Sequence, residues 1–117
     1  MHKYKDLNIW QFSMDLTSTI YSITQAFPDE EKFGLKSQMR RCAVSIPSNI
    51  AEGAGRNGKA EFKQFIGIAL GSLFELDTQV ELSYKFKYIS ESDFSTIMSE
   101  IVKIRKMMFS FQNTISK

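Results

Sequence analysis

The segment from Leu35 to Arg56, LKSQMRRCAVSIPSNIAEGAGR, constrains the fold more than any other part of the chain. Its apolar residues recur at steps of three and four, which places them along one side of an α-helix and excludes a β-strand. These residues are Leu35, Met39, Cys42, Ala43, Ile46, Ile50 and Ala54. We therefore interpret the segment as the central helix of a small helical bundle.

A line of polar residues runs along the same helix beside the apolar line, and such a line needs partners on a neighbouring helix. On a later predicted helix, Glu75 and Gln79 lie one turn apart. We expect them to meet the central helix through an ion pair between Arg41 and Glu75, in a partly buried network that fixes register. The predicted structural polar network consists of Gln38, Arg41, Ser45, Asn49, Glu52, Glu75 and Gln79.

Pro47 lies in the middle of the central helix, where it removes one N–H and crowds the carbonyl of Ala43, at a cost of about 3 kcal/mol. Ser45 and Ser48 flank this break and can hydrogen-bond the backbone groups that it frees. The apolar spacing keeps its phase across the proline, which favours a kinked continuous helix. The alternative is two short helices.

Three stretches of the chain resemble one known family: SIPSNIAEG at 45–53, the pair Glu61 and Phe62, and IALGSLFEL at 68–76. They are similar to the four-helix-bundle family of 23S rRNA intervening-sequence proteins, and the resemblance extends over essentially the whole chain. It implies a bacterial, cytoplasmic up-and-down bundle that assembles into a ring, a homopentamer. It also implies kinship with the accessory bundle protein of diversity-generating retroelements, which binds nucleic acid.

The length of 117 residues predicts a single domain spanning 1–117, large enough to bury its own core. One cysteine, Cys42, excludes an internal disulfide and fits a reducing, cytoplasmic compartment. The most apolar window, 65–76, is too short to cross a bilayer, and the N-terminal residues do not read as a signal peptide.

The remaining helices follow from periodicity and capping residues. We predict a first helix from residues 7–9 to 25–26, a third from about 59 to 86, and a fourth that reaches about 115. Ser90 with Asp93 reads as the capping box of the fourth helix. The prediction is therefore an all-α, antiparallel up-and-down four-helix bundle with a proline-kinked second helix.

The glycines carry two local expectations. Gly53 and Gly55 are expected to end the central helix in a left-handed cap. Gly67 and Gly71 lie one turn apart on the third helix, where they predict that another helix approaches closely.

The outer helices have wider apolar arcs than a single packing contact requires. The surplus residues are Trp10, Met14 and Tyr21 on the first helix, and Met98, Val102 and Phe109 on the last. Such a surplus predicts contact with another subunit.

Catalytic patterns are weak. The run from Gly53 to Lys59 matches the start of a phosphate-binding loop, yet Ala60 stands where magnesium needs a hydroxyl, and a helix precedes the run. The single histidine, His2, leaves no base for a nucleophile, and no Glu-x-x-His pair is present for a di-metal site. Asp29, Glu30 and Glu31 are assigned to the electrostatics of a helix start, although a divalent cation is an alternative. We expect no enzyme activity, no metal and no cofactor.

The basic residues are unevenly distributed. The net charge of the chain is only +2, yet the segment 32–63 has seven basic and two acidic residues, a balance of +5. The predicted nucleic-acid-binding residues are Lys36, Arg40, Arg56, Lys59 and Lys63. Repeated around a ring they would form a continuous positive belt that binds structured RNA or other nucleic acid. The alternative is a protein-interaction scaffold whose charges form an ordinary solvated surface.

Overall fold

The computed structural model describes residues 3–116, which form four α-helices and two short 3-10 turns, with no strand in that range. This confirms the all-α, four-helix prediction. The elements are η1 (Tyr4–Asp6), α1 (Asn8–Thr24), η2 (Asp29–Glu31), α2 (Leu35–Ala54), α3 (Lys59–Lys85) and α4 (Glu91–Ser116).

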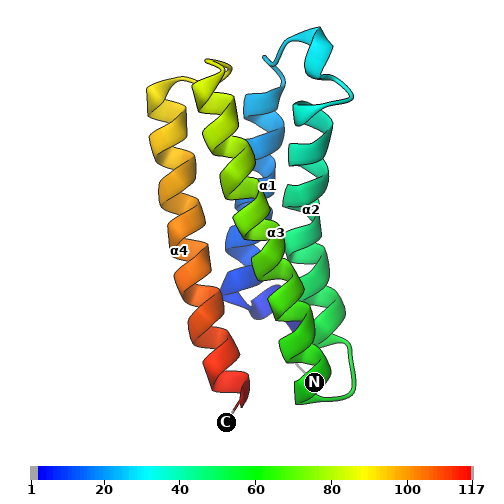
Figure 1. Ribbon diagram of the computed structural model, residues 1–117. Coiled ribbons are helices and arrows are strands. Elements are labelled where there is room, and N and C mark those ends of the chain that lie inside the picture. The colour runs from blue at the N-terminus through cyan, green and yellow to red at the C-terminus, as the bar shows by residue number, and fades with distance from the viewer. Residues whose placement is uncertain (1–2, 117) are drawn as a thin grey trace.

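The four helices form an elongated bundle of 44 × 24 × 20 Å. Helix α2 packs against α1 and α3, and α4 completes the bundle by packing against α3 and α1. Successive helices alternate in direction, so that the start of α1 and the end of α4 lie at the same end of the bundle (Figure 1). The other end carries η2 and the α3–α4 connection.

The core consists of the apolar residues that recur at helical spacing. On α2, Met39, Ala43, Ile46 and Ile50 have no exposed surface, and Cys42 and Ala54 are also buried. The matching residues of the other helices include Leu16, Ile20, Ile66, Leu73, Leu76, Val80, Ile97, Ile101, Ile104 and Met108. Each large apolar side chain of this kind contributes about 1.5–3 kcal/mol when it is fully buried.

Helix α2 runs without a break through Pro47, so the alternative of two short helices is wrong. Pro47 deprives the carbonyl oxygen of Ala43 of its backbone donor, and the hydroxyl of Thr17 on α1 lies 3.1 Å from that oxygen. Nearby, the side-chain amide of Asn49 donates to the carbonyl of Ser45 at 2.7 Å. The Thr17 hydroxyl therefore supplies a donor to the carbonyl from which Pro47 removes one. The kink itself stays a prediction.

The connection between α3 and α4 contains two caps. The backbone N–H of Asp93 donates to the hydroxyl of Ser90 at 3.0 Å, which confirms the predicted helix start. At the end of α3, Lys87 adopts a left-handed conformation with φ of 65°. The N–H of Tyr88 donates to the carbonyl of Ser83, which is the longer bond of a Schellman motif.

The expectations for Gly55 and Gly71 are wrong, whereas a Cβ on Gly67 would lie 3.6 Å from the side chain of Gln112 on α4. Gly55 follows α2 with φ of −86°, and no glycine in the described residues has positive φ. A Cβ on Gly71 would meet nothing within 4 Å, so no helix of this chain approaches it. The close approach is at Gly53, where a Cβ would lie 2.6 Å from Cβ of Phe65 on α3. Gly53 therefore serves helix packing.

Some of the surplus apolar residues pack within the chain. Trp10 and Met98 are partly buried against the core, whereas Met14, Tyr21 and Phe109 each remain more than two-fifths exposed. Among residues 3–116, every helix lacks the combination of length and apolar character that a bilayer span requires.

Candidate nucleic-acid interface

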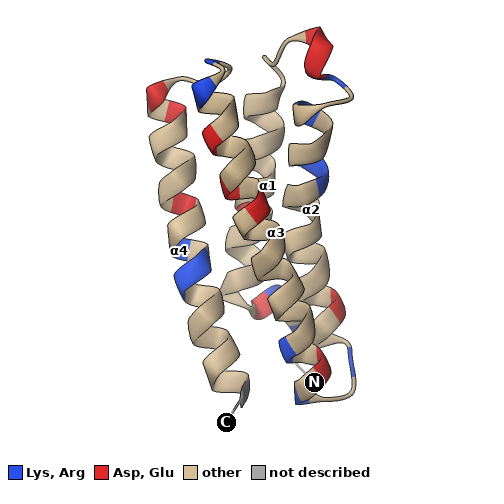
Figure 2. Cartoon of the chain, in the orientation of Figure 1, with Lys and Arg blue, Asp and Glu red and all other residues tan. Residues whose placement is uncertain are grey.

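The predicted basic residues separate into two groups at opposite ends of α2. Lys36 and Arg40 lie at the start of the helix, whereas Arg56, Lys59 and Lys63 surround the turn into α3 (Figure 2). The 20 residues of α2 correspond to a rise of about 30 Å between the groups. Within one chain the basic residues therefore form two clusters and no continuous belt.

The first group belongs to a larger cluster around a surface cavity of about 460 Å³. Three stretches contribute to it: the end of α1, the connection that follows η2, and the first two turns of α2. We call it the helix-start cluster, and its members are Tyr21, Lys32, Phe33, Lys36, Arg40 and Arg41. Four of its six members are cations and the other two are aromatic.

Arg40 is held in this cluster by uncharged groups. Its Nε donates to the hydroxyl of Thr24 at 2.9 Å, and one terminal nitrogen donates to the carbonyl of Tyr21 at 3.0 Å. The guanidinium also lies 4.5 Å from the centroid of the Tyr21 ring. These contacts fix the guanidinium in place and leave its positive charge without a counter-ion.

The cations of the helix-start cluster have no acidic partner. Within residues 3–116, no carboxylate lies within 4.0 Å of Lys32, Lys36, Arg40 or Arg41. None of the residues that line the cavity is acidic. The residues that line the cavity therefore carry four positive charges and no negative one, and the three acids Asp29, Glu30 and Glu31 directly precede Lys32 in the chain.

Glu31, the nearest acid before the cluster, is engaged elsewhere. One carboxylate oxygen accepts the backbone N–H of Leu35 at 3.0 Å, and the other accepts the hydroxyl of Tyr88 at 2.9 Å. The second bond raises the pKa of Tyr88, because it favours the protonated phenol. The first bond caps α2, which confirms for Glu31 the role predicted at a helix start.

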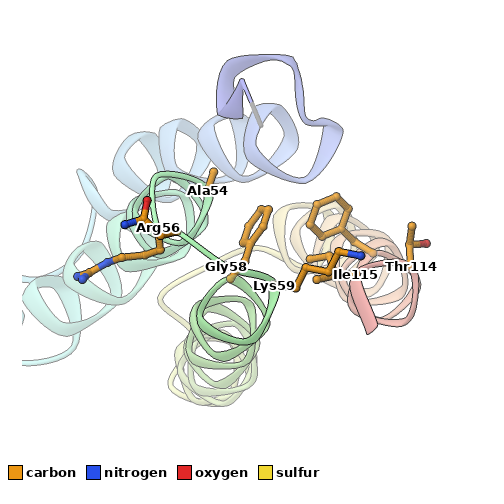
Figure 3. Close-up of a pocket in the computed structure, with 9 residues that line it drawn as sticks. Ala54, Arg56, Gly58, Lys59, Thr114 and Ile115 are labelled. Atoms are coloured by element: carbon orange, nitrogen blue, oxygen red, sulfur yellow. The ribbon is translucent and has the colours of Figure 1, made fainter. Parts of the chain in front are cut away.

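The second group, which we call the turn cluster, consists of Arg56, Lys59 and Lys63. Arg56 donates to Glu52 at 2.8 Å and lies 3.9 Å from Glu61, so nearby carboxylates largely offset its charge. A pocket of about 550 Å³ opens between this turn and the end of α4. Figure 3 shows Lys59 reaching toward Ile115 across this pocket, while Arg56 is directed away from Ile115.

The predicted polar network forms only in part. The hydroxyl of Ser45 lies 2.6 Å from that of Ser72 on α3, and the thiol of Cys42 donates to the Ser72 carbonyl at 3.0 Å. Glu52 pairs with Arg56, and Asn49 bonds within its own helix. Sequence reasoning missed Ser72, although it precedes Glu75 by three residues and so shares its face of α3.

The predicted ion pair between Arg41 and Glu75 is wrong. No such pair lies within 4.0 Å in the described part of the chain, and both side chains are exposed, as is Gln38. Exposed charges gain little from pairing because water already solvates them. Gln79 is buried, and its side-chain oxygen has no hydrogen-bond partner among residues 3–116.

Cys42 is held in its neutral form. Burial, together with the nearby Glu75 carboxylate, raises the pKa of the thiol to about 12. Such a thiol is a poor nucleophile near neutral pH. Residues 3–116 contain no group of three potential metal-ligating side chains.

The chain is similar to known proteins in sequence and in fold. The profile of the 23S rRNA-intervening sequence protein family matches residues 5–110. A crystal structure of a protein of unknown function from the S23 ribosomal protein family of Bacteroides thetaiotaomicron superposes with a TM-score of 0.82 at 23% identity. The match covers 90% of this chain and 95% of that one, and it supports the bundle fold. Among curated proteins, none matches. Since the family profile spans nearly the whole chain, the protein belongs to the 23S rRNA-intervening sequence protein family.

Proposed function

We propose that this protein is a non-enzymatic, cytoplasmic homo-oligomer that binds structured RNA or other nucleic acid through the helix-start cluster. The observation that carries the proposal is the gathering of four cations, none paired with a carboxylate in the described residues, around one cavity. Lys36 and Arg40 were predicted for this role from the sequence, and we add Lys32 and Arg41 because they line the same cavity.

The physical basis is charge neutralisation of phosphates. Lysine and arginine that contact phosphate release the counter-ions condensed on a nucleic acid, and this release drives binding that weakens steeply with salt. Such contacts position the nucleic acid without reading its sequence. The family description, which refers to 23S rRNA, favours RNA as the ligand.

Assembly would multiply the effect of one cluster. Ile68, Gly71 and Phe74 share one face of α3, and the two apolar side chains are each nearly half exposed. Because Gly71 has open space beside it, this face can receive a helix of another copy. The resemblance to bundle proteins that form rings favours a homopentamer, in which the clusters of several copies engage one ligand.

The test of binding is a salt titration of the wild-type protein against a structured RNA and a blunt DNA duplex, measured by fluorescence anisotropy. We expect binding at low ionic strength, with an affinity that falls steeply as salt rises. No retention of either nucleic acid at low salt would defeat the proposal. Light scattering on the same sample tests assembly, and the mass of a monomer would contradict it.

The runner-up function is a protein-interaction scaffold without a nucleic-acid role. The observation that favours it is the set of exposed apolar side chains outside the helix-start cluster, among them Phe74, Phe86 and Phe109. A protein that assembles but ignores polyanions at low salt would support the scaffold. Retention of RNA that is lost on adding salt would favour the leading proposal.

A further inference from the structure

Phe33 is the most exposed large apolar side chain in the described part of the chain, at 88%. It lies between Lys32 and Gly34 in the connection before α2, and it lines the same cavity as Lys36 and Arg41. Lys32 Nζ lies 5.4 Å from the centroid of its ring. The aromatic ring is thus exposed among unpaired cations.

We propose that Phe33 is a stacking platform for an unpaired base, so that the helix-start cluster selects single-stranded segments of nucleic acid over a continuous duplex. This inference rests on the proposed function and deepens it, because it names the class of ligand. It predicts that loops, bulges and ends are the parts of a structured RNA that bind here.

The cations of the cluster are sufficient to bind phosphates. Phosphates need only positive charge and hydrogen-bond donors, and Lys36 and Arg41 supply both. Phosphate binding does not require an aromatic residue beside these cations. An exposed phenylalanine adds nothing to phosphate binding. It gains affinity when a flat, apolar partner covers it, and a nucleobase adjoining a bound phosphate is such a partner.

Tyr21 is the other aromatic residue of the cluster. Arg40 lies against the Tyr21 ring and is fixed by its bonds to Thr24 and to the Tyr21 carbonyl. The guanidinium of arginine is itself a planar group on which bases stack. The cavity of about 460 Å³ is therefore lined by two surfaces on which a base can stack, the Phe33 ring and the Arg40 guanidinium, and Arg40 is also one of its four cations.

The preference for unpaired bases follows from the stacking of bases within a duplex. In a duplex each base is already stacked between its neighbours, and its faces are inaccessible to a side chain on the protein surface. A duplex therefore engages the cations alone. A single strand engages the cations and Phe33 together, so the same cluster holds it more tightly at equal salt.

The experiment compares three labelled ligands of equal length: a single-stranded RNA, a blunt RNA duplex, and an abasic strand with phosphates but no bases. The full-length protein and its variants Phe33→Ala, Phe33→Trp and Phe109→Ala are titrated with each ligand. Phe109 is a matched control, because it is also an exposed phenylalanine but lies on α4 outside the cluster.

We expect Phe33→Ala to weaken binding of the single strand by roughly 5-fold to 100-fold, the range typical of one lost stack. Binding of the abasic strand and of the duplex should change by less than about 2-fold, because no phosphate contact is removed. Phe33→Trp should retain the wild-type affinity for the single strand. Phe109→Ala should leave the ratio of single-strand to abasic-strand affinity unchanged, because Phe109 lies outside the cluster and can act only through the predicted subunit contact. The salt dependence should be the same for all four proteins.

Two results would overturn the inference while leaving the proposed function intact. One is wild-type protein that binds the single strand no better than the abasic strand. The other is a Phe33→Ala variant that binds the single strand as tightly as wild type does. A Phe33→Ala variant whose mass by light scattering differs from that of wild type would also overturn the inference, because Phe33 would then be a subunit contact. Wild-type protein that binds none of the ligands at low salt would overturn the inference and the proposed function together.

Discussion

The hydroxyl of Thr17 on α1 lies 3.1 Å from the carbonyl oxygen of Ala43, the oxygen that Pro47 leaves without a backbone donor. The same hydroxyl lies 2.8 Å from the Ser13 carbonyl of its own helix, so its proton is shared between two acceptors. A side chain from a neighbouring helix thus compensates for a proline in the middle of α2. This contact ties the unusual sequence of α2 to the packing of the bundle.

Replacing Thr17 by Val should lower the free energy of unfolding by about 1 kcal/mol, because a hydroxyl donor to two carbonyls is lost. Urea denaturation followed by circular dichroism measures the change. Thr19→Val is the matched control, since the Thr19 hydroxyl donates only within its own helix, to Asp15. We expect that control to stay within about 0.5 kcal/mol of wild type.

The role of Pro47 in this effect can be isolated with a double-mutant cycle. In a Pro47→Ala background, residue 47 regains a backbone N–H that can donate to Ala43. Thr17→Val should then cost less than it does beside the proline. An equal cost in both backgrounds would show that the Thr17 hydroxyl does not compensate for the proline.

Gly53→Ala should destabilise the bundle by roughly 1–3 kcal/mol, the cost typical of overpacking. The added methyl group would lie 2.6 Å from Cβ of Phe65 and 3.0 Å from a ring carbon of Phe62, so α2 and α3 would have to separate. Gly71→Ala, whose methyl group meets nothing within 4 Å in its own chain, should instead stabilise α3 by up to about 1 kcal/mol at protein concentrations too low for the proposed subunit contact at this face to form. Thermal melts at matched protein concentration compare the two variants. Equal changes in melting temperature for Gly53→Ala and Gly71→Ala would refute the role of Gly53 in helix packing.

Cys42 should make stability fall at alkaline pH. Its pKa is raised from 9.0 to about 12 in the folded state, so the unfolded chain releases the thiol proton first as pH rises. Between these pH values the folded protein holds a thiol proton that the unfolded chain has lost. The contribution of the Cys42 thiol to the free energy of unfolding is therefore fully present below pH 9 and is lost as pH rises toward 12. Denaturation curves of wild type and Cys42→Ala across this range isolate the effect, since the variant lacks the group that titrates.

The same cysteine should resist thiol reagents at neutral pH in the folded protein and react at an ordinary rate after unfolding in urea. Rapid labelling of native protein would contradict the burial of the thiol and its bond to the Ser72 carbonyl.

Much of the fold follows from periodicity and capping. The apolar residues of α2 are buried where their spacing predicts, and the Ser90 cap and the start of α3 at Lys59 agree with the sequence. These features are local, because three- and four-residue spacing and a serine before a helix act within a turn or two. Contacts between helices are not local, and the failed predictions for Gly71 and for the Arg41–Glu75 pair are of that kind, whereas the left-handed cap at Gly55 is a local prediction that failed.

The roles of the glycines show this limit clearly. Gly53 and Gly71 look alike in the sequence, yet one faces α3 at contact distance and the other faces open space. Which face of a helix meets its neighbour depends on how the helices rotate and cross. A glycine on a packed face and a glycine on an open face leave the same apolar spacing in the sequence, so the spacing does not distinguish them. The Arg41–Glu75 pair failed for the same reason, since both side chains remain exposed.

The candidate site could be predicted in part. Lys36 and Arg40 are recognisable from their four-residue spacing and local charge. The contribution of Phe33 and Tyr21 could not be seen, because a connection before α2 and the end of α1 come together only in the folded chain. Conversely, Glu52 lies one turn before Arg56 and Glu61 lies five residues after it. These two nearby acids in the sequence indicate that the charge of Arg56 is compensated.

The most direct test of the account compares charge reversal in the two clusters. Lys36→Glu with Arg41→Glu alters the helix-start cluster, and Lys59→Glu with Lys63→Glu makes the same change of charge in the turn cluster. All four side chains are free of carboxylate partners in residues 3–116, so neither pair of substitutions breaks an ion pair. RNA affinity at several salt concentrations is measured beside the mass from light scattering. We predict that the first pair abolishes most binding and lowers the salt dependence without altering assembly, while the second pair has a much smaller effect. Equal losses from both pairs, or a larger loss from the turn cluster, would contradict the account.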